Sequence, residues 1–261
     1  MVKRLFKWLK GTYLGLILLF LYAPIAVMIT LSFNASKTRS KWGGFSFKWY
    51  VELFTNSPEI MQAVKITLEV AVIATIISVI LGTFAAIGIY AARKGYAKSL
   101  INLSYLPMTM PDIVTGVSLM LMFVFVNIPR GMFTMILAHV TFDTPYVLFA
   151  VLPKLRQLDP NTYEAALDLG CKPMKAIFKV MIPEISPGIV TGGLLALTMS
   201  LDDFVISFFT TDYDQNLSTL IYSAAKRSVP PSIYALSTIM FITVLVLLII
   251  INKRSTLESM S

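Results

Sequence analysis

Residues 63–92 read AVKITLEVAVIATIISVILGTFAAIGIYAA. The stretch contains two charged side chains, Lys65 and Glu69, and both lie near its start. A helix needs about 20 predominantly apolar residues to cross the hydrocarbon core of a bilayer. We therefore expect this stretch to form a membrane-spanning helix.

Five more stretches have the same character, which places the chain in one class of protein. The six blocks are Tyr13–Phe33, Ala63–Ala92, Leu100–Val126, Phe133–Leu152, Pro187–Phe209 and Ile233–Ile251. Hydrophobic residues make up 56% of the 261 residues, against about 45–50% in soluble domains. The segments between the blocks are short. The sequence predicts an all-α integral membrane protein with six transmembrane helices, forming a single transmembrane domain over residues 1–261.

Basic residues flank the six blocks unevenly. If both termini face the cytosol, fourteen of the 22 lysine and arginine residues fall in cytosolic segments and eight in outer ones. Short cytosolic loops of membrane proteins carry an excess of positive charge. This favours two cytoplasmic termini. No single basic face forms, so we expect no nucleic-acid partner.

Neither a disulfide nor a metal site is expected. Cys171 is the only cysteine of the chain, so it cannot form an internal disulfide. His139 is the only histidine, so no cluster of Cys and His ligands exists for a metal. We expect His139 to be a packed side chain whose hydrogen bonds are satisfied.

The third block is longer than one straight span requires. Residues 99–127 would extend about 43 Å as a helix, whereas the hydrocarbon core is about 30 Å thick. Pro107 and Pro111 lie inside the block, and proline removes a backbone donor and clashes with the preceding turn. We expect a break near Leu106–Pro111. Irregular backbone at that depth survives only against protein or beside a water-filled cavity, so the break is either a packed kink or a wall of a substrate path.

The fifth block carries start and packing signals. Ser186 is a suitable N-cap and Pro187 a suitable first helical residue. Gly188 and Gly192 are four residues apart, a spacing that lets helices approach closely in lipid.

A segment between the fourth and fifth blocks, residues 154–183, predicts two short cytosolic helices with a bend. Asp159 can cap the first helix with Pro160 at its first position, and Gly170 can end it. Pro173 can open the second helix, and Pro183 is expected to end it.

The second short helix carries an apolar stripe at helical spacing, formed by Met174, Ile177, Phe178 and Met181. Such a stripe can lie on the membrane, rest on the protein's own spans, or fill a groove in another protein.

The same segment carries a recognisable pattern. It runs Glu164-Ala165-Ala166, three residues, Gly170, nine residues, and Val180-Met181-Ile182-Pro183. This resembles the EAA loop of ABC-importer permeases, with conservative departures at Val180 and Ile182. The resemblance implies a type I importer (MetI-like) fold in a bacterial inner membrane, with coupling helices that seat in a cleft of the ATPase. The predicted coupling residues are Glu164, Ala165, Ala166, Gly170, Met174, Ile177, Phe178 and Pro183.

The resemblance also implies partners. The chain contains no Gly-x-x-x-x-Gly-Lys-Ser/Thr phosphate loop, so ATP and Mg²⁺ are expected on a separate ABC ATPase dimer and the chain itself is not an enzyme. A second permease subunit, an external substrate-binding protein and membrane lipid complete the expected set.

Further stretches point to a cargo class. They are Pro111-Asp112-Ile113-Val114, His139-Val140-Thr141-Phe142, Ser200-Leu201-Asp202-Asp203-Phe204, Ile221-Tyr222-Ser223 and Ser232–Leu236. Together they look like the spermidine/putrescine permeases of the PotC type, which implies a polyamine cargo. The alternatives are the same type of ABC permease with another small-molecule cargo, a stand-alone secondary carrier, and a membrane scaffold that transports nothing.

Acidic residues at membrane depth give a separate reason to expect a cationic cargo. They are costly there, yet carboxylates and aromatic faces are the groups that bind ammonium ions. The acids at or near membrane depth are Glu69, Asp112, Asp143, Asp202 and Asp203. The residues predicted to line the substrate path are Asp112, Ser200, Asp202, Asp203, Tyr222, Lys226 and Trp49.

Each of these residues has a structural alternative. Asp112 can simply cap the half-helix after the break, and Lys226 can be a solvated loop charge. Asp202 or Asp203 can pair with Lys226 or Arg227 as a gate. Glu69 and Asp143 are expected to form helix–helix hydrogen bonds.

Trp49 belongs to an aromatic-rich first outer loop. It is expected to stack on substrate or on the external binding protein, while the loop's aromatics as a group can instead anchor the protein at the headgroups.

Overall fold

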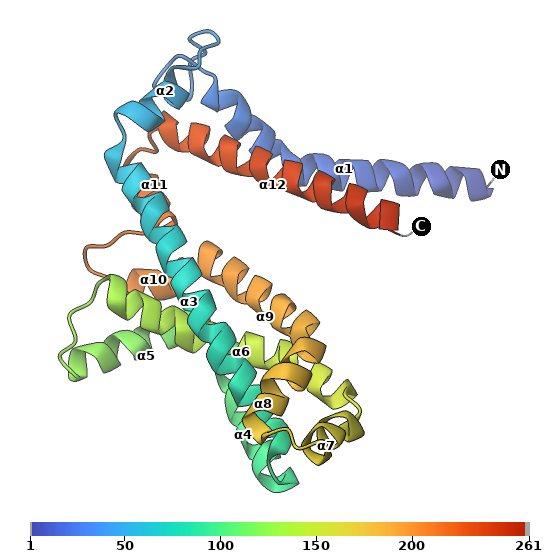
Figure 1. Ribbon diagram of the computed structural model, residues 1–261. Helices are drawn as coiled ribbons and strands as arrows, with labels where there is room; N and C mark the ends of the chain where they lie inside the picture. Colours follow the sequence, from blue (N-terminus) through green and yellow to red (C-terminus); the bar gives the residue numbers. More distant parts are fainter. Residues whose placement is uncertain (1, 259–261) are drawn as a thin grey trace. The chain divides into compact units, whose positions relative to one another are not determined.

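The computed structural model describes residues 2–258 (Figure 1). The described chain divides into two compact units: unit 1, the described part of Met1–Gln62 with that of Ile221–Ser261, and unit 2, Ala63–Leu220. Residues 1 and 259–261 of the predicted domain lie outside the described residues. Apart from one isolated antiparallel bridge between Asn34 and Phe45, the described chain has only helices and loops.

The helices follow one another with short connections. In chain order they are α1 (Val2–Ser32), α2 (Lys48–Thr55), α3 (Pro58–Ala91), α4 (Lys94–Thr109), α5 (Asp112–Phe125), α6 (Met132–Gln157), α7 (Pro160–Asp168), α8 (Pro173–Ala176), the π-helical turn η1 (Ile177–Met181), α9 (Ile182–Asp202), α10 (Val205–Thr210), α11 (Leu217–Arg227) and α12 (Pro231–Glu258).

The predicted all-α membrane architecture is confirmed for the described residues. Four continuous helical stretches are long and apolar enough to span a membrane: Lys10–Ser32, Pro58–Ala91, Met132–Gln157 and Pro173–Asp202. The pair α4 and α5 passes the same test as one broken span, and Pro231–Val246 in α12 is a shorter apolar helix. Each predicted block therefore corresponds to a helix, except that the third covers the pair α4 and α5 and the fifth, Pro187–Phe209, extends from α9 into α10.

The predicted break in the third block is confirmed. Helix α4 ends at Thr109, α5 begins at Asp112, and their axes differ in direction by 102°. Pro107 lies inside the last turns of α4, and Pro111 takes the extended backbone that caps α5. The bend places the start of α5, with Asp112 as its first residue, at an irregular point of the chain.

The predicted start of the fifth span is wrong. Ser186 and Pro187 lie inside α9, which follows η1 directly. Pro183 lies in the first turn of α9 and does not end the preceding helix, contrary to the prediction. The π-helical turn before Pro183 has a wider hydrogen-bonding pattern, which accommodates a residue that cannot donate to the carbonyl four residues earlier. One helical stretch therefore runs from Pro173 to Asp202.

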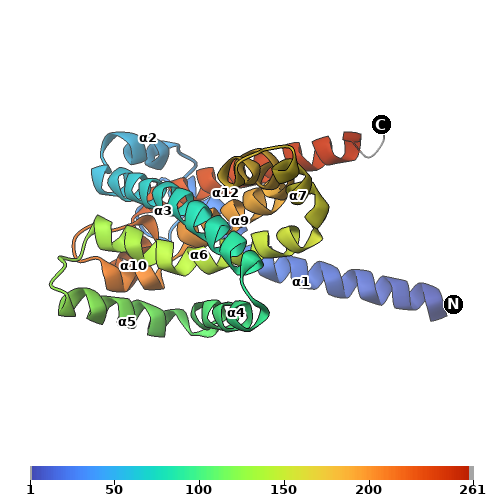
Figure 2. The same ribbon diagram turned by 60° about the horizontal axis from the view of Figure 1, so that its bottom comes forward.

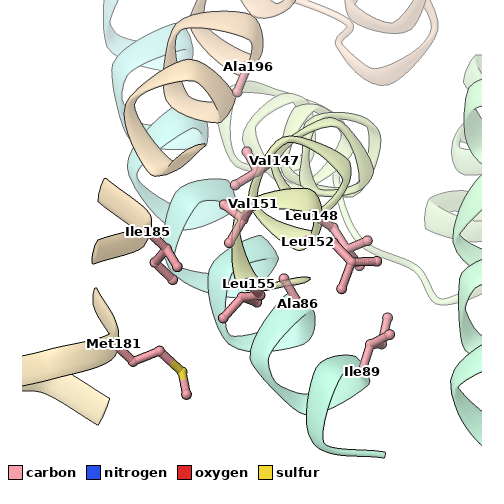
Figure 3. Close-up of a cluster of buried hydrophobic side chains, with 10 residues drawn as sticks. All are labelled: Ala86, Ile89, Val147, Leu148, Val151, Leu152, Leu155, Met181, Ile185 and Ala196. Atoms are coloured by element: carbon pink, nitrogen blue, oxygen red, sulfur yellow. The ribbon is translucent and has the colours of Figure 1, made fainter. Parts of the chain in front are cut away.

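Unit 2 has its core where α6 packs against α9 and α3. Figure 3 shows the buried side chains that α3, α6, η1 and α9 contribute to this core. They are Ala86, Ile89, Val147, Leu148, Val151, Leu152, Leu155, Met181, Ile185 and Ala196. Because α6 contributes five of these ten, it is the central helix of the cluster.

Helices α6 and α9 approach each other unusually closely. A Cβ atom added to Gly192 would lie 3.0 Å from the Val147 Cα, and one added to Gly188 would lie 3.0 Å from the Ala150 carbonyl oxygen. The predicted packing role of these two glycines is therefore confirmed, since only a residue without a side chain leaves room for the neighbouring backbone.

Unit 1 is built on the pair α1 and α12, which run antiparallel side by side (Figure 1). Helix α2 packs on α12 and buries Trp49 and Leu53. The apolar stretch Lys10–Ser32 of α1 is mostly exposed, and its most apolar 18-residue window contains no buried residue, as is typical of a helix that meets lipid or another subunit. That the two termini face the cytoplasm stays a prediction.

The glycine contact between α3 and α6 gives a stability test. A Cβ at Gly82 would lie 2.7 Å from the Val147 Cβ and 2.9 Å from the Thr144 carbonyl oxygen, so one helix must shift. We expect Gly82→Ala to lower the free energy of unfolding by about 1–3 kcal/mol. Thermal unfolding of the purified chain in detergent measures the change.

Gly88 provides the matched control on the same helix. Nothing lies within 4 Å of a Cβ added there, and alanine is the better helix former. Gly88→Ala should leave the melting temperature unchanged or raise it. Equal melting temperatures for the two variants would contradict the close approach.

Candidate functional site: an acidic cavity beside a buried polar network

An acidic cavity of about 370 Å³ lies in unit 2. Its lining residues are Asp112, Phe142, Thr198, Met199, Asp202, Asp203, Phe204 and Val205. The three acids predicted to line the substrate path, Asp112, Asp202 and Asp203, are therefore brought together at one cavity. None of its described lining residues is basic.

The broken third span and the end of the fifth span build this cavity. Asp112 opens α5 directly after the 102° bend, and Asp202 is the last residue of α9. The two meet because α10, which follows α9, lies beside α5 (Figure 1, Figure 2). Gly116 allows this contact, since a Cβ there would lie 3.0 Å from the ring of Phe209. The break thus lines a cavity rather than forming only a packed kink.

Asp203 is held by hydrogen bonds from its own chain. Its Oδ1 accepts from the backbone N–H of Ile206 at 3.1 Å, and its Oδ2 accepts from the N–H of Ser207 at 2.7 Å and from the Ser207 hydroxyl at 2.8 Å. The carboxylate therefore binds the free N–H groups at the start of α10. Its capacity to accept further hydrogen bonds is largely used.

His139 is the centre of the polar network beneath the cavity. Its Nδ1 lies 2.6 Å from the Ser200 Oγ, and its Nε2 lies 2.9 Å from the Ser207 Oγ and 3.4 Å from the Asp203 Oδ2. The Asn216 side-chain amide donates to the Ser207 Oγ at 2.8 Å. The expectation that His139 is a satisfied packing residue is confirmed. Ser200, 2% exposed, belongs to this network and does not line the cavity.

Asp112 and Asp202 differ from Asp203 in having no partner. Both are exposed, and neither forms a hydrogen bond or ion pair with the described residues. Asp112 is the first residue of α5, where the helix dipole favours negative charge. These two carboxylates are consequently the acids of the cavity that are free to bind a cation.

The prediction that Glu69 and Asp143 form helix–helix hydrogen bonds is wrong. Glu69 forms an ion pair with Lys65 on its own helix, with Nζ and Oε1 3.6 Å apart, because residues four apart on a helix are neighbours. Asp143 is fully buried, and neither of its carboxyl oxygens has a hydrogen-bond partner.

Three of the residues predicted to line the substrate path, Trp49, Tyr222 and Lys226, belong to unit 1. Tyr222 and Lys226 lie on α11 one turn apart, with the ammonium nitrogen 4.2 Å from the ring centroid. Trp49 is only 1% exposed and donates from its indole nitrogen to the Asn34 carbonyl oxygen. This burial does not support stacking of Trp49 on substrate or partner. The exposed aromatics of the first outer loop are Trp42, Phe45, Phe47 and Phe54. The gate pairs join residues of the two units and stay predictions.

The cavity also has walls that sequence reasoning did not assign to it. Thr198 and Met199 lie four and three residues before Asp202 on α9, so helical spacing places them on one side of the helix. Phe142 and Phe204 lie inside the motifs singled out above. Their placement at the cavity depends on the α5–α10 contact, which no local pattern reveals.

The coupling segment has the predicted start, stop and bend. The Asp159 carboxylate accepts from the Asn161 N–H at 3.0 Å and caps α7, with Pro160 at its first position. Gly170 follows α7 with a φ of 79°, a conformation that favours glycine. Pro173 opens α8.

The apolar stripe of the segment is divided between two faces. Met174 and Phe178 are 59% and 52% exposed, whereas Met181 is buried in the core of unit 2. The π-helical turn η1 causes this division, because its extra residue per turn rotates the following side chains relative to an α-helix. Met174 and Phe178 are thus the members of the stripe that face outward, and Leu169, after the end of α7, is exposed as well.

A second cavity lies next to this segment. It measures about 280 Å³ and is lined by residues of α3, α7, η1 and α9, including Tyr90, Glu164, Ile177 and Val180. No group of three or more metal-ligating side chains occurs in the part of the chain that the structure describes.

Comparison with known proteins identifies a family. A family model described as "Binding-protein-dependent transport system inner membrane component" matches residues 78–253. The putrescine transport system permease protein PotI of Escherichia coli (strain K12) is 41% identical over 232 residues, covering 84% of this chain and 81% of that protein. The spermidine/putrescine transport system permease protein PotC of Haemophilus influenzae is 35% identical over 244 residues, covering 93% and 95%.

Solved structures share the fold. A bacterial ABC transporter involved in the import of the acidic polysaccharide alginate matches with a TM-score of 0.73 and 14% identity, covering 97% of both chains. An amino acid ABC transporter matches with a TM-score of 0.52 and 20% identity, covering 76% of this chain and 96% of that one. Identities this low bear on the fold alone.

The hydrogen bonds of Asp203 predict that it contributes to stability. We expect Asp203→Ala to lower the free energy of unfolding by about 1–3 kcal/mol, since it removes a helix cap and leaves buried donors unpaired. Asp202→Ala, next to it but without partners, should change it by less than about 0.5 kcal/mol. Thermal unfolding of both variants measures the difference, and equal stability would show that the cap is not used.

Proposed function

The chain belongs to the binding-protein-dependent transport system inner membrane components, and on that premise we propose that its cargo is a polyamine, putrescine or spermidine. Family membership makes it a multi-pass inner-membrane permease subunit of an ABC importer, of the PotC type, and not an enzyme. The relatives that are 41% and 35% identical are named for putrescine and for spermidine/putrescine transport.

The observation that carries the cargo proposal is the pair of free carboxylates at one cavity. Asp112 and Asp202 line it together with Phe142 and Phe204, and neither acid forms a hydrogen bond or ion pair with the described residues. A polyamine has several ammonium groups and few other polar groups. Carboxylates bind such groups through charge-assisted hydrogen bonds, and aromatic faces add cation–π attraction. With no basic residue among its described walls, the cavity suits a cation.

Asp203 and Ser200 take indirect roles in this proposal. Asp203 adds negative charge at the cavity while its oxygens bind α10 and His139. Ser200 holds His139 in place. Tyr222 and Lys226, which interact with each other, are proposed to act at the outer mouth, where a lysine would repel an ammonium group until the path opens.

The helix that reaches the cavity also begins in the coupling segment. The stretch Pro173–Asp202 is helical throughout, and 30 residues at the rise of an α-helix span roughly 45 Å. A displacement of Met174 and Phe178 by an ATPase would therefore be carried along this helix toward Asp202. ATP and Mg²⁺ would bind to the ATPase dimer, and the energy of their binding and hydrolysis would reach this chain through residues 154–183.

Membership of the family supports a proposal for the rest of the importer. A second permease subunit would complete the path, an external binding protein would deliver the cargo, and both termini would face the cytoplasm. Residues 1–261 would act as a single transmembrane domain within that assembly.

If Asp112 and Asp202 bind the cargo, neutralising both carboxylates should reduce uptake. We expect Asp112→Asn combined with Asp202→Asn to lower polyamine uptake at least roughly tenfold, because two charge-assisted hydrogen bonds are lost. The melting temperature should change little, since neither residue forms a hydrogen bond or ion pair with the described residues. Uptake of radiolabelled putrescine and spermidine into proteoliposomes holding the full importer measures this.

Glu69→Gln is the matched control, because it neutralises a half-buried acid whose ion pair among the described residues is with Lys65 on the same helix. It should leave uptake at the wild-type rate. If the double variant also transports at that rate, the acidic cavity is not the cargo path. If wild type carries no polyamine, the cargo proposal itself fails.

The outward apolar groups of the coupling segment predict a separate defect. We expect Met174→Asp to weaken association with the ATPase at least tenfold, because a charge placed in an apolar contact costs more than the ~1.4 kcal/mol that corresponds to that factor. Co-purification and ATP hydrolysis of the reconstituted importer measure it.

Phe133→Asp is the matched control, since Phe133 is also exposed, 63%, but lies at the opposite end of α6 from the coupling segment. It should leave association with the ATPase unchanged. Unchanged association for Met174→Asp would remove this side chain from the coupling contact.

A further inference from the structure

Asp143 is the buried carboxyl group that the proposed function does not use. It lies on α6 with 0% of its surface exposed, and both of its oxygens lack a hydrogen-bond partner. Buried polar groups in proteins are almost always paired, and a carboxyl group inside a membrane span is especially costly to leave without a partner. Such a group calls for a functional reason.

The pairing of α6 with α9 places Asp143 between the two helices. His139 meets Ser200, and Val147 lies so close to Gly192 that a Cβ added there would be 3.0 Å from its Cα. Asp143 lies midway between His139 and Val147, four residues from each, as Ala196 lies midway between Ser200 and Gly192. In an antiparallel pair of helices this register sets Asp143 opposite Ala196, which is itself fully buried. Ala196 offers only a methyl group to a carboxyl.

The surrounding part of unit 2 supplies no cation for Asp143. Helices α5, α9 and α10 contain no lysine or arginine, and the lysine of α3, Lys65, lies thirteen residues before Ser78, which meets α6 at Val140. Along α6 the nearest is Lys154, eleven residues away, or about 16 Å by helical rise. His139 is one turn from Asp143, but its two ring nitrogens already meet Ser200, Ser207 and Asp203. A cationic partner for Asp143 must therefore come from outside this part of the chain.

The acidic cavity adjoins this position, and the coupling segment is connected to it through α6 and α9. Phe142, the preceding residue, lines the cavity. Asp203 approaches His139, which precedes Asp143 by one turn, or about 6 Å along the helix. Both α6 and α9 lead directly into the coupling segment, so a movement of that segment acts first on the contact between these two helices.

We propose that Asp143 is a second cation-binding residue of the transport path, which receives an ammonium group of the cargo when α6 and α9 separate. This assignment of Asp143 rests on the proposed function, since it requires a cargo with at least two positive charges. The first ammonium group binds at Asp112 and Asp202, and the second meets Asp143 deeper between the helices. An unpaired buried acid destabilises the fold, and on this proposal the acid is kept because transport requires it.

Asp143→Asn in the full importer tests this, because it keeps the shape and removes the charge. We expect polyamine uptake to fall roughly ten- to a hundredfold, the value of one charge-assisted hydrogen bond. ATP hydrolysis stimulated by the loaded binding protein should stay near wild type. The melting temperature should stay equal or rise, since the wild-type carboxyl group has no partner to lose.

Thr83→Val is the matched control. The Thr83 hydroxyl is also buried without a hydrogen-bond partner, in the neighbouring helix α3, but it cannot bind a cation by charge. It should leave both uptake and ATP hydrolysis unchanged.

Two results would overturn the assignment. One is wild-type uptake by Asp143→Asn. The other is a parallel loss of uptake, ATP hydrolysis and melting temperature, which would mean that Asp143 only supports the fold. Failure of the proposed function is distinct, because the wild-type importer would then carry no polyamine at all.

Discussion

The close approach of α6 and α9 is the constraint on which the rest of unit 2 depends. Glycines at 188 and 192 let the α9 backbone meet α6 at van der Waals distance, where dispersion between packed atoms replaces the hydrophobic driving force that lipid does not supply. The same register brings His139 to Ser200. A larger side chain on this face of α9 would separate the helices and shift every residue beyond it, including the acids at the cavity.

The acids at membrane depth are chemically alike but differ in what remains free to bind. Asp203 is occupied by the N–H groups of α10 and by His139. Asp112 and Asp202 open on the cavity and Asp143 is enclosed, and none of the three forms a hydrogen bond or ion pair with the described residues. A carboxylate whose lone pairs are used stabilises the fold, whereas one without donors can bind a cation. The buried network around His139 thus holds the cavity wall in place while leaving two carboxylates available.

The coupling segment and the cavity are connected by the same two helices. Helix α6 enters the segment and α9 leaves it, and α9 continues to Asp202 without a break. The π-helical turn η1 divides the apolar stripe between the core and the outward face. Met181 therefore fixes the segment to unit 2 while Met174 and Phe178 stay available for a partner. Force applied at the segment acts on the α6–α9 contact, where Asp143 lies.

The sequence by itself determined the six apolar blocks, the break before Asp112, and the cap and stop at Asp159 and Gly170, because hydropathy, proline and glycine act through local backbone chemistry. It also marked the acids that meet at the cavity. Only the tertiary structure decided what each one does. The use of Asp203 as a cap, the isolation of Asp143 opposite Ala196 and the burial of Trp49 depend on side chains distant in the chain. The continuation of α9 through Pro183, Ser186 and Pro187 likewise depends on a π-helical turn that no local signal announces.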